Sequence, residues 1–393
     1  MLKCLYIIVV ILVTNAVARS VFPVPRLSTA CTQVAVRRDI TKMSPGELER
    51  FFEAAREMHR RGWLDGFGSM HDHISRQIHG NENFFGWHRR FIRHFEMLMQ
   101  QIDPGIVLPY WNWGARWQNP LADPVLGKDF FGGTGRPGDN CVMDGVEGRW
   151  GRNYPSRGCL VRKFRYGTTP GSFWPMRAVR DVMASSQSHA EFRSRIENGA
   201  HGIIHLGLGG DFETMWAPVD VLFFLHHAMV DKIWAEWQSK NPSRLRRVDG
   251  FDSSHQPLTV NSPLPFYGDT IGTTLVTTAP GYCYMYDDVA PPPDNARSRA
   301  VEFRASVRNS LEFSNDTDPD NELFAAHEDA EDLEPPEPAP ENWLSKRGLD
   351  VEEAARMHVL VSRVVRQMNE ERRAFIRALN GTKAASTDQN QPL

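Results

Sequence analysis

The chain has 393 residues, of which 41% are hydrophobic and 24% are charged, and its formal net charge is −3. This length is enough for one large globular domain with its own hydrophobic core and an appendage. A net charge so close to zero gives no electrostatic basis for nucleic-acid binding, so we expect no nucleic-acid partner.

Residues 1–18 have the pattern of a secretory signal peptide. Lys3 supplies a positive charge, Leu5–Val13 is apolar, and Ala16–Ala18 fits the small-x-small cleavage rule. The apolar run is shorter than a helix that spans a bilayer, so a membrane anchor is the less favoured alternative. No later segment is long and apolar enough for a membrane span. We therefore expect a secreted protein that begins near Arg19 and has no membrane partner.

Four cysteines remain after the signal peptide, and an even number in a secreted chain predicts two disulfides. Four cysteines allow three connectivities, which the sequence alone leaves open. We favour Cys141–Cys159, which closes a local loop rich in Gly and Arg. The second pair is then Cys31–Cys283, which ties together the two ends of the domain.

The first clear helix signal begins at Ser44, which can cap a helix while Pro45 suits the first turn and Glu47 bonds back to the cap. Apolar residues at helical spacing continue this helix to Met58. A second amphipathic pattern predicts a helix from about Phe84 to Gln100.

The middle of the chain changes character several times. Residues 110–175 are rich in Gly, Pro and Arg, and predict loops. A third helix precedes or contains His201 and His205, and a fourth begins after Asp220 and stops at Asn241-Pro242. Short β-like pieces follow, such as Thr273–Thr278.

The C-terminal part is expected to form an appendage to the main domain, which spans 19–313. Residues 314–341 are acidic and rich in Pro, which predicts a solvated linker. An apolar stripe over 342–380 predicts an amphipathic helix that packs back on the main domain, followed by a disordered tail at 381–393. The sequons at Asn315 and Asn380 agree with a secreted glycoprotein.

Most of the 14 histidines fall in two windows that lie about 110 residues apart. Neutral imidazole is a good ligand for copper, zinc, iron and nickel. Each window holds four imidazoles, and three from each are enough to predict two metal ions held side by side. The window histidines are His71, His73, His79, His88, His201, His205, His226 and His227.

Helical spacing indicates how these groups converge. His201 and His205 are four residues apart, so on a helix both rings leave from one face. We expect a mainly α fold in which a four-helix bundle holds a dinuclear site, with a loop-rich periphery, few short strands and a C-terminal helix. Glu96 and Asp231 are the expected carboxylates that orient metal-bound imidazoles, and His73 and His226 are expected to lie beside the ligands.

Several motifs resemble the tyrosinase and catechol oxidase family of type 3 dinuclear copper proteins. They are His79-x8-His88 within Phe-x-Trp-His-Arg-Arg, His201-x3-His205 before Gly209-Gly210, and Phe-Phe-Leu-His-His-Ala-x-Val-Asp from Phe223 to Asp231. The resemblance covers roughly residues 31–286 and is nearest to the short secreted forms.

The resemblance implies the ligand set. The first copper ion is expected at His71, His79 and His88, with His73 as the alternative to His71, because local register is uncertain from one sequence. The second copper ion is expected at His201, His205 and His227, with His227 preferred to His226 on the family pattern.

The family chemistry implies that this copper pair uses O2 to oxidise o-diphenols to o-quinones. The phenol ring is expected to stack on His205, and Glu197 is the expected holder of a water that helps to remove the phenol proton. The family members that hydroxylate monophenols carry an Asn where this chain has Gly202. Without the Asn, the base that removes the phenol proton is weaker. We therefore expect oxidation of diphenols and doubt hydroxylation of monophenols.

The expected function is thus a secreted phenol oxidase whose partners are O2 and a small phenol, and whose products feed melanin or matrix cross-linking. The alternative is an oxygen-binding protein that resembles haemocyanin, and a metal-free scaffold is the third reading. Turnover of a catechol distinguishes the enzyme from the other two.

Overall fold

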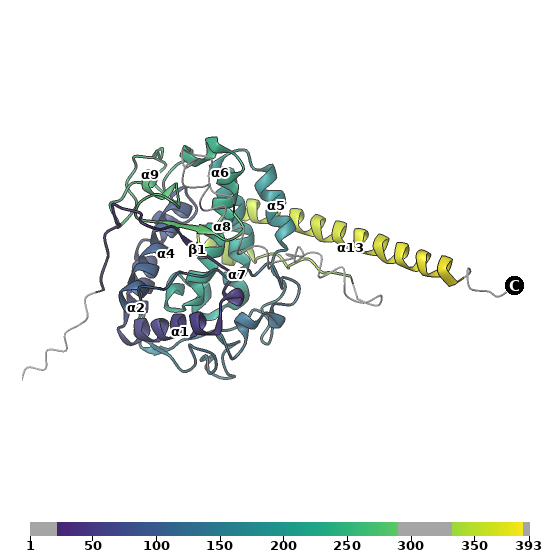
Figure 1. Cartoon of the computed structure of the whole chain (residues 1–393), viewed down its shortest axis with the longest axis horizontal. Coiled ribbons are helices and arrows are strands. Elements are labelled where there is room, and N and C mark those ends of the chain that lie inside the picture. The colour runs from purple at the N-terminus through teal and green to yellow at the C-terminus, as the bar shows by residue number, and fades with distance from the viewer. Residues whose placement is uncertain (1–21, 290–331, 388–393) are drawn as a thin grey trace, which may run out of the picture.

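The structure is a computed structural model that describes residues 22–289 and 332–387 (Figure 1). As the sequence predicts, it is mainly α-helical with a few short strands. The α-helices are α1 (Pro45–Arg60), α2 (Trp63–His73), α3 (Ser75–Ile78), α4 (Asn83–Ile102), α5 (Met176–Ser185), α6 (His189–Ile196), α7 (Gly202–Leu208), α8 (Leu222–Ser239), α9 (Ile271–Thr274), α12 (Glu341–Lys346) and α13 (Val351–Thr387). The strands are β1 (Ala35–Arg37), β2 (Gly151–Arg152), β3 (Gly158–Cys159) and β4 (Tyr284–Tyr286).

Local signals explain where the long helices begin. The Ser44 hydroxyl accepts a bond from the Glu47 backbone, and the Glu47 carboxylate accepts one from the Ser44 backbone, so the predicted capping box at the start of α1 is confirmed. The helix predicted near Phe84–Gln100 is confirmed as α4, which runs slightly further at both ends.

The core is a bundle in which α4 packs along α8, with α2 and α7 beside them. Stacked aromatic rings fill the space between the helices: Phe95 lies 3.7 Å from Phe224, and Phe67 meets Phe224 edge-on at 5.1 Å. Aromatic pairs in these arrangements hold helices in one register, because each ring buries a large area with a defined geometry. The bundle therefore gives rigid support to side chains that point into it.

Both predicted disulfides are present. Cys31 and Cys283 have Cα atoms 5.6 Å apart and lie next to the parallel pair β1–β4, in which Ala35 is opposite Tyr284. Cys141 and Cys159 also have a Cα separation of 5.6 Å and lie where β2 and β3 pair antiparallel. Each bond thus fastens one of the two small sheets to the loops around it.

Two parts of the sequence prediction are wrong. The β-like piece predicted at Thr273–Thr278 is absent: α9 takes up its first two residues, and a bend and a turn follow. The hydroxyls of Thr273 and Thr274 donate to backbone carbonyls of Thr270 and Ile271 in the preceding turn, which makes a helical turn favourable in a β-branched segment. Helix α2 was not predicted from the sequence at all.

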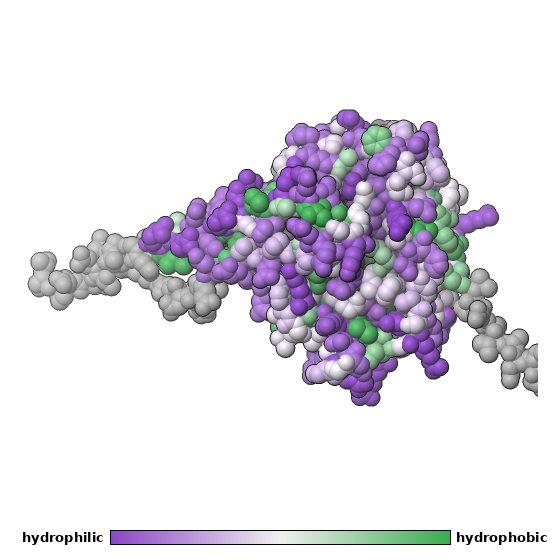
Figure 2. All heavy atoms as spheres, turned by 180° about the vertical axis from the view of Figure 1, so that it is seen from behind, coloured by the Kyte–Doolittle hydropathy of each residue, from purple (hydrophilic) through white to green (hydrophobic). Residues whose placement is uncertain are grey.

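The C-terminal segment returns to the main body and then leaves it. The range predicted as one helix, 342–380, is divided between α12 and α13 by a turn. The first part of α13 packs on the π-helical turn η4 (Glu197–His201), α5 and α6, and the rest projects from the body (Figure 1). The view from behind shows this projection beside a largely hydrophilic surface with small apolar patches (Figure 2).

The domain boundaries remain predictions. The signal sequence 1–18 and the sequon at Asn315 lie outside the described residues, as does most of the acidic linker. Within the expected disordered tail, 381–387 is instead helical, because α13 continues to Thr387 through Ala384 and Ala385, which are strong helix formers. In the two described ranges, none of the helices combines the length and apolar character needed to cross a bilayer.

Candidate metal centre

The first histidine cluster gathers three rings from three neighbouring elements. His71 lies near the end of α2, His79 follows α3, and His88 lies on α4. One ring nitrogen from each lies within 4.8 Å of the others, and the Nε2 atoms of His71 and His88 are 3.3 Å apart. These three side chains could hold one metal ion.

The second cluster lies on two helical segments. His201 ends η4 and His205 follows one turn later on α7, while His226 and His227 lie on α8. The ring centroids of His201 and His205 are 4.6 Å apart, as expected for two rings on one helical face. Ring nitrogens of all four histidines lie within 4.8 Å of one another, so this group could also hold a metal ion.

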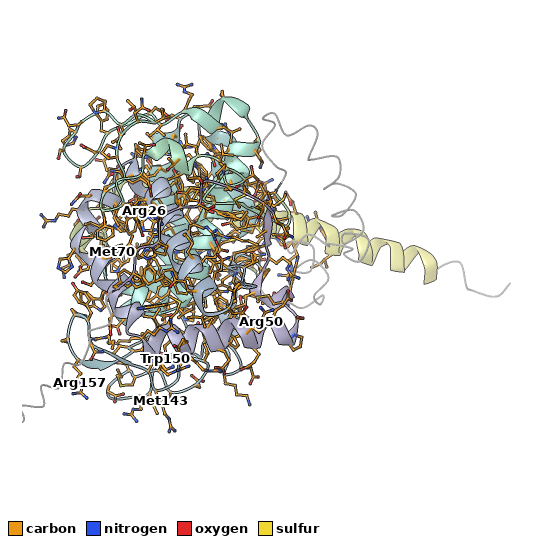
Figure 3. The ribbon with its side chains drawn as sticks, turned by 60° about the vertical axis from the view of Figure 1, so that its left-hand side comes forward. Arg26, Arg50, Met70, Met143, Trp150 and Arg157 are labelled. Carbon is orange, nitrogen blue, oxygen red and sulfur yellow. A yellow bond between two sulfur atoms is a disulfide. The ribbon has the colours of Figure 1, made fainter. Side chains whose placement is uncertain are left out.

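The two clusters are in direct contact. The ring of His88 stacks on the ring of His227 with centroids 4.3 Å apart. Phe223 lies 4.2 Å from His227, and Phe84 lies 5.0 Å from His201, so aromatic side chains wall the site. Figure 3 shows how densely side chains fill the body around these helices.

Backbone carbonyls fix the orientation of the imidazoles. The Nδ1–H group of His71 donates to the carbonyl of Met215 at 2.5 Å, and that of His205 donates to Phe212 at 2.7 Å. Three more rings do the same to carbonyls one turn earlier in the chain: His79 to Ser75, His88 to Phe84 and His201 to Glu197. A carbonyl can only accept, so the proton sits on Nδ1 and the Nε2 lone pair is free to bind a metal.

The site keeps its histidines neutral. Burial lowers the pKa of His79 to about 4. Burial, together with the neighbouring imidazoles, holds the pKa values of His71, His88, His201, His205, His226 and His227 well below the ordinary range. Metal binding requires the neutral form of imidazole, so the whole set is ready to coordinate at neutral pH.

The donor set fits copper. Nε2 of His201 and both ring nitrogens of His227 are buried without a hydrogen-bond partner, and buried polar atoms without partners are costly unless a ligand satisfies them. Two adjoining groups made only of imidazoles suit copper, because imidazole is a preferred ligand of that metal. The residues present therefore agree with the metal that the sequence motifs imply.

The carboxylates expected behind the ligands do something else. Glu96 pairs with Arg37 at 2.7 Å and accepts from the backbone of Leu108, and it bonds to none of the cluster histidines. Asp231 pairs with Arg89 at 2.5 Å and accepts from the hydroxyls of Tyr284 and Tyr286. The prediction that they orient imidazoles is wrong, because the Phe84 carbonyl already accepts from Nδ1 of His88, Nδ1 of His227 has no partner, and buried arginines pair with both carboxylates.

The structure separates the two neighbouring histidines left open by the sequence. His73 is exposed and its Nδ1 donates to the carbonyl of Ser69, away from the cluster, so its expected place beside the ligands is wrong. His226 is fully buried inside the second cluster, with its ring 5.3 Å from that of His201 and no partner for either nitrogen.

Glu197 lies between the clusters. Its side chain is buried, with Oε1 accepting from the backbone of Gly80 at 2.9 Å and Oε2 accepting from Arg193 at 3.0 Å. Burial raises the pKa of Glu197 to about 7, although Arg193 and the backbone bond oppose the shift. The carboxyl can therefore change protonation state near neutral pH.

The C-terminal segment covers the second cluster. An added Cβ on Gly202 would lie 3.8 Å from the ring of Trp343 on α12 and 3.2 Å from the carbonyl of Glu197. The backbone of Asp350 donates to the Asn198 side chain at 2.8 Å, which anchors the turn between α12 and α13 on η4. No sequence pattern predicted this contact, because it joins segments far apart in the chain.

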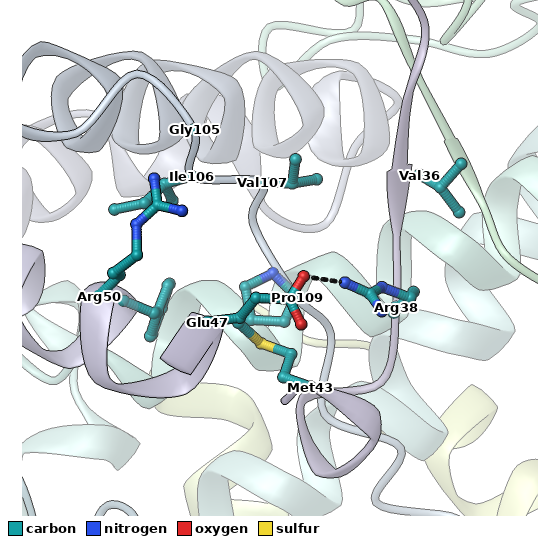
Figure 4. Close-up of a pocket in the computed structure, with 10 residues that line it drawn as sticks. Val36, Arg38, Met43, Glu47, Arg50, Gly105, Ile106, Val107 and Pro109 are labelled. Carbon is teal, nitrogen blue, oxygen red and sulfur yellow. Dashed lines mark hydrogen bonds and ion pairs between the residues drawn. The ribbon is translucent and has the colours of Figure 1, made fainter. Parts of the chain in front are cut away.

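A cavity of about 730 Å³ opens beside the first cluster, at His79. Its wall combines the segment from Ser75 to Glu82, the loop from Gly250 to His255 and the segment from Ser345 to Gly348. A much smaller cavity of about 60 Å³ between β1, α1 and the loop at Gly105 contains the Arg38–Glu47 ion pair (Figure 4). None of the residues that line this second cavity is a histidine, so it has no part in the metal centre.

Comparison with known proteins agrees with this geometry. The common central domain of tyrosinase matches residues 52–240. The tyrosinase of Streptomyces antibioticus is 34% identical over 237 residues, which is 53% of this chain and 85% of that protein. Grixazone synthase of Streptomyces griseus is 29% identical over 312 residues, which is 65% of this chain and 99% of that protein.

A solved structure has the same fold. A mutant form of polyphenol oxidase from Thermothelomyces thermophila aligns with a TM-score of 0.55 and 20% identity, over 64% of this chain and 88% of that one. Together with the sequence matches, this shows that the chain belongs to the tyrosinase family, a family of copper oxidoreductases.

Proposed function

We propose that the protein is a secreted phenol oxidase in which six histidines hold two copper ions. His71, His79 and His88 would hold the first ion, and His201, His205 and His227 the second. The observation that carries the proposal is the contact between the clusters, since the 4.3 Å stacking of His88 on His227 brings the two ligand groups together. His226 would remain a neighbour rather than a ligand.

When bound, the copper pair would supply O2 activation and two-electron oxidation of a phenol to a quinone. The protein's own part would be to position the phenol and to move its proton. The His205 ring, which is 9% exposed, would form the face on which the phenol stacks. Burial of His71, His88, His201 and His227 would exclude water from the reacting groups on their side of the site.

Glu197 would assist the proton transfer. Its carboxyl, whose pKa burial raises to about 7, could take the phenol proton near neutral pH, directly or through a water. Gly202 offers no side chain to hold such a water. This favours o-diphenols, which are easier to oxidise, over monophenols, with a quinone as the product in either case.

Secretion is part of the same proposal. Two disulfides in the described residues agree with an oxidising compartment, and the N-terminal 18 residues have the composition of a signal peptide. The exported enzyme would deliver quinones for melanin or for cross-linking outside the cell.

The direct test loads the purified chain with copper and measures oxygen uptake with a catechol and with the matching monophenol. Rapid uptake with the catechol and slow uptake with the monophenol are expected. A protein that binds copper and O2 but turns over neither compound would contradict the proposal and favour the haemocyanin-like alternative. The Gly202→Asn variant should raise the monophenol rate relative to the catechol rate by about 10-fold, whereas Gly202→Ala, which adds only the Cβ, should not.

A further inference from the structure

The cavity beside His79 has the size of a small-molecule site. Its volume of about 730 Å³ lies within the range of about 300–1,000 Å³ that ligand pockets occupy. His79 and Met215, whose carbonyl orients His71, both line it, so the cavity adjoins the first cluster. A side chain on a phenol bound at the metal centre would reach this cavity past His79, toward the C-terminal segment.

The charged groups of the wall do not cancel. The cations are Arg76, Arg193, Lys346 and Arg347, the carboxylates are Glu82 and Asp252, and the imidazoles are His79 and His255. Arg193 is neutralised by Glu82 at 2.8 Å and by Glu197 at 3.0 Å. The carboxylate of Asp252 accepts from the backbones of Ser254 and Gln256, which orient it within its own loop and leave it as one negative charge against the remaining cations of the wall.

Three cations remain available to a ligand. Arg76 and Lys346 are exposed, and neither forms an ion pair within residues 22–289 and 332–387. Arg347 donates to the carbonyls of Glu213 and Trp343, and its guanidinium lies 4.2 Å from the Trp343 ring. A carbonyl carries no full charge, so these bonds fix the guanidinium in place, and the nearby Glu213 carboxylate offsets its charge only in part.

We propose that this cavity selects phenols that carry a carboxylate, with Arg76, Lys346 and Arg347 as the residues that determine this specificity. The inference rests on the proposed phenol oxidation and names its substrate class. A carboxylate on a short chain from the ring would meet guanidinium and ammonium groups, which bind it through charge-assisted hydrogen bonds. A protonated amine at the same place would be repelled.

Three catechols that differ in one group test this selection. They are 3-(3,4-dihydroxyphenyl)propanoic acid, its methyl ester and 2-(3,4-dihydroxyphenyl)ethylamine. With the copper-loaded full chain, kcat/KM should fall in that order, mainly through KM. The preference for the acid should also shrink as ionic strength rises, because salt screens exposed charges.

Charge-removing variants connect the preference to the cavity. In the double variant Arg76→Gln/Lys346→Gln, the ratio of kcat/KM for the acid to that for the ester should fall about 5- to 10-fold, as expected when two exposed charges are lost. Arg157→Gln removes an exposed cation from a distant loop and is the matched control, for which the ratio should stay that of the unmodified chain. A ratio that is the same in the double variant and in the unmodified chain would overturn the inference.

Binding to the metal-free chain separates this inference from the proposed function. Calorimetric titration should show that the acid binds several-fold more tightly than the ester, and that the double variant loses the difference. If no catechol is oxidised but this difference holds, the proposed oxidation fails and the anion-selective cavity stands. If catechols are oxidised but acid and ester bind equally, the cavity proposal fails alone.

Discussion

The two histidine clusters differ in how the chain builds them. The first cluster takes one ring from α2, one from the residue that follows α3 and one from α4. The carbonyl that accepts from His71 belongs to Met215, which lies 144 residues further along the chain. The second takes its rings from η4 with α7 and from α8, two continuous helical segments. The first cluster therefore depends more on tertiary contacts, and the second more on helical geometry.

The two clusters also differ in what holds their rings in place. His226 and His227 make no hydrogen bond to any described residue, and Phe223 and the ring of His88 hold His227 in place. His79, in contrast, is partly exposed and bonded to the carbonyl of Ser75. The comparison indicates that the second cluster is preformed by packing, whereas the first has a ligand at the edge of the cavity.

Removal of a ligand should have the largest effect. We expect His88→Ala or His227→Ala to lose one bound copper ion and to lower phenol oxidation by more than about 100-fold, since even groups behind the ligands contribute 10- to 100-fold. Copper per chain and oxygen uptake measure this. His73→Ala is the matched control and should keep both values. If His226→Ala loses copper and His227→Ala keeps it, then His226 is the ligand and His227 is the neighbour.

Asp231→Asn should reduce stability rather than copper binding. The change leaves Arg89 buried without its carboxylate, which costs about 3–5 kcal/mol in the free energy of unfolding. Urea denaturation of the metal-free chain measures it. Glu236→Gln removes a partly buried carboxylate that pairs with the exposed Lys240 on the same helix, and should change stability by less than about 1 kcal/mol. A weaker copper affinity in folded Asp231→Asn, with unchanged stability, would restore the role expected from the sequence.

Acid should destabilise the metal-free chain through the buried histidines of both clusters. Buried imidazoles have pKa values below that of the unfolded chain, so the unfolded state binds more protons once the pH falls below about 6.5. Stability should fall by about 1 kcal/mol or more per pH unit from there toward pH 4, where His79 itself titrates. Thermal melting across this window measures the loss. Constant stability between pH 7 and 5 would show that the rings are not kept neutral by burial.

Glu197→Gln should have the smallest of these effects. The base form of Glu197 is present above a pH of about 7, so activity in the unmodified enzyme should rise through that pH. The variant should lose this rise and about 10-fold in kcat/KM. Glu197 also holds the Gly80 backbone, so bound copper is measured in parallel. If the loss of bound copper explains the whole loss of activity, and the variant keeps the pH profile of the unmodified enzyme, then Glu197 has a positioning role only.

The sequence predicted what short-range rules control. The capping box at Ser44, the long helix α4 and the local Cys141–Cys159 bond follow from spacing. The six expected copper ligands came instead from the resemblance to a known family, and the Cys31–Cys283 bond joins segments 252 residues apart. Helix α2 escaped prediction, because Gly66 and Gly68 weaken its helical pattern. Both glycines approach neighbouring groups closely, as a Cβ on Gly68 would lie 2.7 Å from Val219.

The misassigned carboxylates illustrate the limit of spacing arguments. Glu96 and Asp231 lie at helical distances from ligands, but a helix has several faces and only tertiary contacts decide which group each carboxylate meets. Arg37, fully buried between them, donates to Glu96 and lies 3.6 Å from Asp231. No local sequence pattern predicts Arg37 as their partner, because Arg37 lies on β1, far earlier in the chain.

The carbonyls that orient five of the imidazoles have a consequence for how this protein tolerates change. A main-chain oxygen is supplied by any amino acid, so exchanging Ser75 or Met215 for another residue removes no acceptor. Inserting or deleting one residue between the histidine and its acceptor would break the hydrogen bond. On a helix, such a change rotates the ring by about 100° relative to the carbonyl oxygen one turn away. A mutational scan should therefore find these segments permissive to substitution and intolerant of any change in length.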